Sequence, residues 1–208
     1  MKLRLYWMVF GLSLASMASV CYAEDAALVK NGKVLAYTCH GCHGIEGYKN
    51  AYPTYSVPKV GGQHAKYLHD ALKEYASGDR AHSTMHAQAA SLSDQDFEAI
   101  TAFFQGSGPS SASAVVGTPP PSTAMCVTCH GSNGVGISPD YPILAGQHRD
   151  FLEQALHDYK SGKRKNPVMT GMAAQIKDED IPMIAAFFAK QSSPLCATDK
   201  IRENGKCQ

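Results

Sequence analysis

Cys39-His40-Gly41-Cys42-His43 is the most informative segment of the sequence, because its Cys-x-x-Cys-His pattern returns later in the chain as Cys126-Val127-Thr128-Cys129-His130. Two thiols three positions apart can reach the two vinyl groups of one haem and form thioether bonds, and the histidine that follows gives the iron its proximal nitrogen. The sequence therefore predicts two covalently bound haem c groups. The expected attachment residues are Cys39, Cys42, Cys126 and Cys129, and the expected iron ligands are His43 and His130.

Other readings of a Cys-x-x-Cys pair are a redox dithiol, a disulfide or half of a zinc site. The histidine after each pair and the repetition of the whole motif both favour haem. The sequence also offers no companion pair of zinc ligands at a suitable spacing.

The motif belongs to a longer internal repeat. A shift of 84 positions aligns residues 62–104 with residues 146–188, and 19 of these 43 positions are identical, far more than ordinary composition explains. We expect two homologous domains, 24–105 and 123–194, joined by a linker at 106–122 that is rich in glycine, serine and proline. A C-terminal tail at 195–208 follows.

The apolar spacing predicts an all-α fold without strands. Helices are expected over 27–38, 63–75 and 147–159, and a capping-box pattern at Ser93 starts a further helix that runs to Phe104 and has its counterpart near Asp178. Three consecutive prolines, 119–121, leave room for only a short opening helix in the second domain.

The sixth iron ligand decides what each haem can do. Met85 and Met169 occupy matched positions, 42 and 39 residues after the proximal histidines, and are expected in a loop before the last helix of each domain. A thioether sulfur is a soft ligand that favours reduced iron. His64 and His148 are the repeat-matched rivals, whereas Met172 has no counterpart in the first domain.

Two further pairs of matched residues suggest supporting roles. The carbonyls of Pro58 and Pro142 would accept the Nδ1 hydrogen of the proximal histidine in their domain, or the two prolines serve only as turn residues. Arg80 and Arg164 would pair with haem propionates or serve as structural surface charges.

The N-terminus, residues 1–23, has the pattern of a cleaved secretory signal: a short basic start, an apolar stretch and small residues before an acidic pair. A retained anchor or a lipidated Cys21 is the alternative. Export to the oxidising periplasm predicts a disulfide between Cys196 and Cys207 that pins the tail to the end of domain two. The formal charge of +1 excludes nucleic acid as an expected partner.

Taken together, the motifs resemble the cytochrome c4 family over residues 24–191. The shared features are two Cys-x-x-Cys-His domains, each with Gly-Gln before a helix, Tyr-x-Ser-Gly-x-Arg, a methionine and a closing Phe-Phe. The resemblance implies tandem class I cytochrome c domains related by an approximate twofold, with haems close enough to exchange electrons. It also implies peripheral membrane association, a terminal oxidase as acceptor, and a blue-copper protein or a cytochrome as donor.

Two six-coordinate haems leave no open iron for a substrate, so we expect an electron-transfer protein rather than an enzyme. The predicted function is a periplasmic dihaem electron carrier in a respiratory chain. The alternative is the dihaem electron-transfer subunit of a flavin-dependent sulfide dehydrogenase. A dihaem peroxidase or a gas sensor needs a displaceable ligand, and the matched methionines argue against both.

Overall fold

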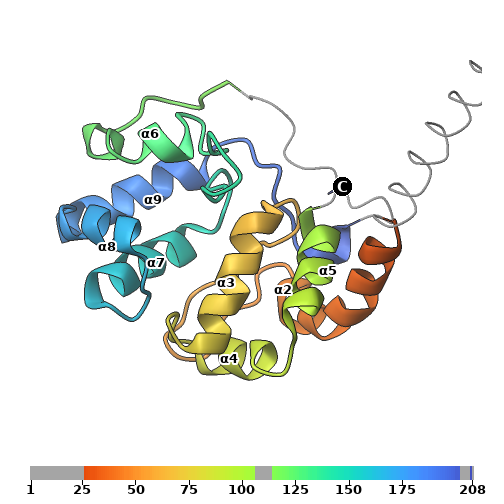
Figure 1. Ribbon diagram of the computed structural model, residues 1–208. Helices are drawn as coiled ribbons and strands as arrows, with labels where there is room; N and C mark the ends of the chain where they lie inside the picture. The colour runs from red at the N-terminus through yellow and green to blue at the C-terminus, as the bar shows by residue number, and fades with distance from the viewer. Residues whose placement is uncertain (1–25, 106–113, 202–206, 208) are drawn as a thin grey trace, which may run out of the picture.

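The computed structural model describes residues 26–105, 114–201 and 207, which form two helical lobes side by side (Figure 1). The first lobe opens with a helical stretch at 26–35 and continues with η1 (Ala36–Cys39), α2 (His40–His43), α3 (Ala65–Ser77), α4 (Ser83–Ala89) and α5 (Asp94–Gln105). The second contains η2 (Pro121–Thr123), α6 (Val127–His130), α7 (Arg149–Ser161), α8 (Pro167–Ala174), η3 (Asp178–Asp180) and α9 (Ile181–Ala189), and η4 (Thr198–Lys200) follows it.

The all-α prediction is confirmed, since these described residues contain only isolated β-bridges and no strand. No helix in the same ranges is long and apolar enough to cross a membrane. The expected signal at 1–23 lies outside the described residues.

The helix boundaries follow local rules that the sequence shows. Ser93 Oγ and the carboxylate of Asp96 satisfy each other's backbone N–H groups, which is the reciprocal capping box predicted for the start of α5. The helices α3 and α7 end at Gly78 and Gly162, both in the left-handed conformation that glycine adopts without strain.

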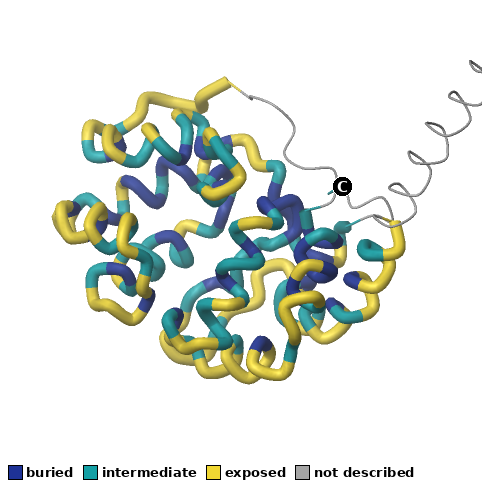
Figure 2. The backbone as a smooth tube through the Cα atoms, viewed as in Figure 1, coloured by how far each residue is buried: buried dark blue, intermediate teal, exposed yellow. Residues whose placement is uncertain are grey.

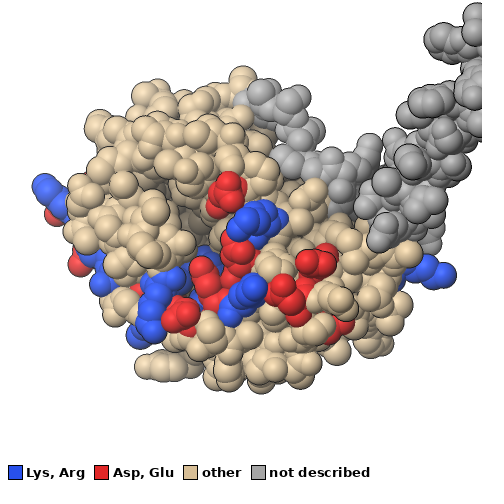
Figure 3. Space-filling view, viewed as in Figure 1, with Lys and Arg blue, Asp and Glu red and all other residues tan. Residues whose placement is uncertain are grey.

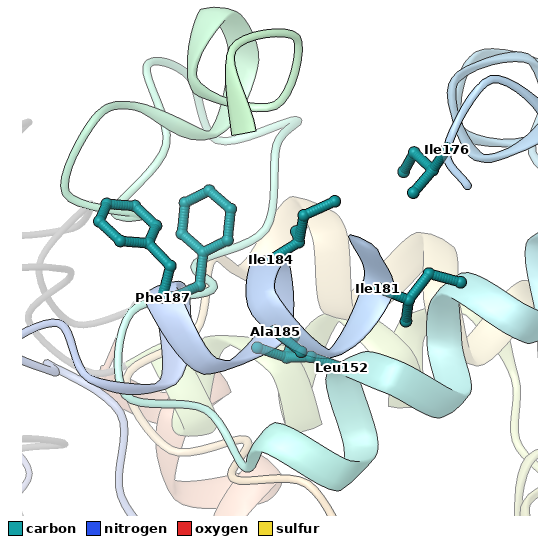
Figure 4. Close-up of a cluster of buried hydrophobic side chains, with 7 residues drawn as sticks. Leu152, Ile176, Ile181, Ile184, Ala185 and Phe187 are labelled. Atoms are coloured by element: carbon teal, nitrogen blue, oxygen red, sulfur yellow. The ribbon is translucent and has the colours of Figure 1, made fainter. Parts of the chain in front are cut away.

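Each lobe is held together by its last helix. In the first lobe, the side chains of Ile100, Phe103 and Phe104 on α5 form the buried cluster with Ala36 and Leu68. In the second, Ile184 and Phe187 project from α9 while Leu152 joins them from α7 (Figure 4). Buried residues accordingly concentrate along these helices and where the lobes meet (Figure 2).

The opening helix differs between the lobes. In the first, the helical stretch 26–35 crosses α5 so closely that a Cβ on Gly32 would lie 1.9 Å from the carbonyl oxygen of Ala99. In the second, only the short η2 precedes the motif, as the proline run predicts. An extended segment takes the place of the missing helix there, and the backbone of Val116 pairs with the side-chain amide of Gln191.

Two glutamines join the lobes by equivalent contacts. The side chain of Gln63 donates to the carbonyl of Ile143 and accepts from its N–H, at 3.0 and 2.9 Å. Gln147, 84 residues after Gln63, makes the same pair of bonds with the backbone of Lys59, at 2.9 and 3.0 Å. Lys59 and Ile143 are also 84 residues apart. This exchange of partners describes an approximate twofold axis between the lobes.

The predicted disulfide is confirmed, but its expected location was wrong. Cys196 and Cys207 are bonded, with their Cα atoms 5.7 Å apart. The tail does not stay at the end of domain two. It crosses to the first lobe (Figure 1), where the backbone of Cys196 pairs with that of Gly61. The tail is therefore a second connection between the lobes, which a local reading of the sequence could not show.

Candidate functional site

The first motif forms a short helical hook. Cys39 ends η1, and α2 carries Cys42 and His43. The Nδ1–H of His43 donates to the carbonyl oxygen of Pro58 at 2.8 Å. A carbonyl can only accept, so this bond places the proton on Nδ1 and leaves the lone pair of Nε2 free to bind a metal.

The second motif repeats this arrangement. His130 at the end of α6 donates from Nδ1 to the carbonyl oxygen of Pro142 at 3.0 Å. Burial lowers the pKa of both His43 and His130, against the opposing effect of these hydrogen bonds. Both imidazoles are thus held neutral, which is the form that ligates iron. The predicted role of the two proline carbonyls is confirmed.

The cysteine thiols do not have the properties of a redox dithiol. Neither motif contains a disulfide. Burial raises the pKa of Cys39 and of Cys126, whereas reactive dithiols need a lowered pKa.

A zinc site is not supported either. Within 26–105, 114–201 and 207, the only cluster of three potential metal-binding side chains is His69, Asp94 and Glu98, which includes no motif residue. The donor set of each motif, two unpaired thiols and one neutral imidazole with a free Nε2, suits covalent haem attachment.

The matched methionines lie in helices, not in the loops expected from the sequence. Met85 and Met169 are each the third residue of a short helix, α4 and α8. The backbone N–H of Met85 donates to Nδ1 of His82, and that of Met169 donates to Oδ1 of Asn166. These caps sit at equivalent repeat positions, and both methionines are half-buried.

The rival ligand His64 has another partner. It precedes α3, and its Nε2–H donates to the carbonyl oxygen of Val135 in the other lobe at 3.2 Å. Its role in the structure is a contact between lobes. Met172, the unmatched methionine, is exposed.

Arg80 and Arg164 are not surface charges. Both are 6% exposed and face each other on the approximate twofold, where their backbones form an isolated bridge. Both donate to the hydroxyl of Tyr67, at 3.1 and 2.7 Å. Tyr67 has Phe151 as its counterpart, so the first lobe alone supplies this acceptor.

Among the described residues, one carboxylate, that of Glu74, forms an ion pair with one of the two arginines. Glu74 lies 3.4 Å from Nε of Arg80, yet the Nε atoms of both arginines are buried without a hydrogen-bond partner. Two adjacent buried guanidinium groups are costly unless anions pair with them. The carboxylates of haem propionates are suitable anions, and the two arginines line one small cleft between the lobes.

The glutamine pair and Tyr67 were missed as functional residues from the sequence. Gln63 and Gln147 were visible as repeat-matched positions, and that match was the signal of a shared role. Tyr67 has a different signal: its counterpart in the repeat is Phe151, so the two lobes differ at a matched position.

Comparison with known proteins gives consistent matches over both lobes. A family model described as cytochrome c matches residues 29–107 and 122–192. Cytochrome c4 of Azotobacter vinelandii is 31% identical over 202 residues, covering 82% of this chain and 91% of that protein. The thiosulfate dehydrogenase electron acceptor of Stutzerimonas stutzeri strain A1501 is 27% identical over 206 residues, covering 89% and 94%. The crystal structure of reduced recombinant cytochrome c4 from Pseudomonas stutzeri has a TM-score of 0.61 at 28% identity, covering 79% of this chain and 98% of that one.

Proposed function

The chain belongs to the cytochrome c family, as a dihaem cytochrome of the c4 type with two covalent haem c groups, and from this premise we propose that it carries electrons from a periplasmic donor to a terminal oxidase. The proposal rests on the two equivalent imidazoles. Each is held by a hydrogen bond to a proline carbonyl and is unprotonated at Nε2. Each motif thus prepares one proximal nitrogen for iron.

The proposed haem sites keep the residues expected from the sequence. Cys39 and Cys42 would attach the first haem, and His43 and Met85 would bind its iron. Cys126 and Cys129 would attach the second haem, and His130 and Met169 would bind its iron. Bound haem supplies one-electron exchange between ferric and ferrous iron, and ligation by histidine and methionine raises the potential.

The protein's own residues orient and insulate these groups. The proline carbonyls fix the histidine tautomers, and the clusters on α5 and α9 exclude water. We propose that Arg80 and Arg164 would pair with the propionate carboxylates of bound haem at the cleft between the lobes. The proposed domain limits remain 24–105 and 123–194, with the linker between them.

The relatives bear on the electron donor of this protein. Relatives named electron acceptors of thiosulfate dehydrogenase match this chain over about nine-tenths of its length. Their names favour a thiosulfate-oxidising donor and do not point to a flavin-dependent sulfide dehydrogenase. A blue-copper protein or a cytochrome stays as an alternative donor. The proposed location is the periplasm, with peripheral membrane association.

Charge on the visible face bears on donor recognition. Positively charged Lys and Arg side chains and negatively charged Asp and Glu side chains gather together along the lower middle of the molecule. The part over α6 and α9 is formed mostly by uncharged side chains (Figure 3). Contacts with a partner on that part of the face would depend little on ionic strength.

Stopped-flow mixing of the purified holoprotein tests the proposal. We expect the oxidised protein to be reduced by a thiosulfate dehydrogenase supplied with thiosulfate, and the reduced protein to be reoxidised by oxidase-containing membranes under air. Failure of reoxidation by those membranes would contradict the carrier role. Purification in a permanent complex with a flavoprotein would instead support the subunit alternative.

A further inference from the structure

The C-terminal tail reaches the first haem motif. We define the clasp as residues 194–201 together with Cys207, closed by the Cys196–Cys207 disulfide. The backbone of Cys196 forms two hydrogen bonds with Gly61, at 3.2 and 3.0 Å. This pairing fixes the start of the clasp two residues before Gln63, which joins the lobes.

The centre of the clasp touches the motif itself. Thr198 is 1% exposed, and its Oγ1 lies 2.7 Å from Nδ1 of His40 in a hydrogen bond. His40 stands between Cys39 and Cys42, the two proposed attachment residues. Its ring also meets Phe103 and Phe104 edge-on, at centroid distances of 6.3 and 6.5 Å. A side chain from the far end of the sequence therefore fixes a residue inside the motif.

Packing around the clasp is close. Ile201 joins the apolar cluster of the first lobe, and Lys200 forms an ion pair with Glu46, just after the motif. A Cβ on Gly61 would lie 2.8 Å from Sγ of Cys196, and a Cβ on Gly62 would lie 2.4 Å from the carbonyl oxygen of Pro194. The clasp thus fills space that only glycine leaves open.

In the part of the chain that the structure describes, the second motif has no corresponding hydrogen bond with the tail. The residue equivalent to His40 is Val127, which offers no side-chain hydrogen bond. Among the described residues, the clasp therefore contacts one of the two repeated motifs. The second motif, which shares the fold but not the clasp, is the internal control for an experiment.

We propose that the clasp positions the first haem motif, with Thr198 acting through His40, and that it shields this haem from water and raises its potential above the value it would have with the clasp open. Solvent exposure is one of the properties that set the potential of a bound metal centre, because water stabilises the more highly charged oxidised form. The inference rests on the proposed haem sites but not on the identity of donor or acceptor.

The test compares three variants of the holoprotein with the wild type. Cys196→Ser/Cys207→Ser opens the clasp, Thr198→Val removes only the hydroxyl, and Thr198→Ser retains it. Hydrogen exchange measured by mass spectrometry follows residues 36–44 and, as the control, residues 124–131. A spectroelectrochemical titration records both one-electron transitions.

With the clasp open, we expect amide exchange at 36–44 to rise at least tenfold while 124–131 is unchanged. The midpoint potential of one transition should fall. The fall should correspond to a three- to tenfold change in the ratio of oxidised to reduced haem, where tenfold corresponds to about 59 mV. Thr198→Val should show a smaller shift of the same sign, and Thr198→Ser should match the wild type.

Equal effects on both segments and both transitions would overturn the proposal, because they would show general destabilisation. No change in either readout for the opened clasp would also overturn it. If the double variant fails to mature, Thr198→Val with its serine control decides the question with the disulfide intact. A protein that passes this test but is not reoxidised by oxidase-containing membranes would refute the carrier role alone.

Discussion

Replacing Gln63 with methionine should loosen the two lobes more than the equivalent replacement of Gln147. Methionine keeps the length and shape of the side chain but removes its amide. Gln63→Met loses the two bonds with Ile143 and a third from the N–H of His64. Gln147→Met loses the corresponding three, with Lys59 and His148.

The difference between the variants comes from burial. Ile143 is 1% exposed, so its N–H and carbonyl would lose their partners without access to water, whereas Lys59 is only half-buried. A lost bond costs about 0.5–1.5 kcal/mol net, and a buried unsatisfied group about 1–3 kcal/mol. We therefore expect Gln63→Met to reduce the free energy of unfolding by about 2–4 kcal/mol and Gln147→Met by about 1–2 kcal/mol.

Urea unfolding of the holoproteins, followed by far-UV circular dichroism, measures both values. Gln175→Met is the matched control, because Gln175 is exposed and its side chain donates to the carbonyl of Gly171 in the adjoining α8, so the change should alter the free energy by less than about 0.5 kcal/mol. A loss for Gln63→Met no larger than that for Gln147→Met would show that the burial of Ile143 does not set the cost. Losses for both no larger than the control would refute the glutamine contacts as the joint between the lobes.

Three further expectations concern charge, potential and thiols. Burial opposes ionisation of Asp150, but the hydrogen bonds from Ser56 and the contact with Lys49 prevail and lower its pKa. The stabilisation is then present above the unfolded-state pKa and lost as the pH falls through the folded one, so Asp150→Asn should flatten the decline in melting temperature below about pH 4. The haem of domain one should have the lower potential, because residues 24–105 carry nine acids and seven bases against seven of each in 122–194, and two identical midpoints in a titration would contradict this. Alkylation of the unreduced holoprotein should label neither Cys196 nor Cys207, and two labelled thiols would disprove the bridge.

Local and repeated features of this fold are predictable from the sequence. Three features follow from rules that involve only a few neighbouring residues. They are the capping box at Ser93, the glycines that end α3 and α7, and the short helical segment that the proline run leaves before the second motif. The carbonyls of Pro58 and Pro142 were predictable because the repeat kept their distance from the Gly-Gln pair.

Features that depend on tertiary contacts were not predictable in the same way. The helices α4 and α8 are only seven and eight residues long and depend on the caps from His82 and Asn166, so their periodicity is too short to detect. The path of the tail is set by the space left at Gly61 and by the hydrogen bond between Thr198 and His40, which are more than 150 positions apart in the chain. The burial of Arg80 and Arg164 arises only when the lobes meet.

The ligands of both irons in the purified holoprotein can be identified by removing each methionine in turn. Met85→Ala and Met169→Ala are each compared with the wild type for haem content, by intact mass, and for the weak far-red absorption band of oxidised iron bound to sulfur. We expect two haems in the wild type and the loss of about half of the band in each variant, because in the proposed sites each methionine ligates one iron. A single haem, an unchanged band in either variant, or loss of the band in His64→Ala instead would contradict it.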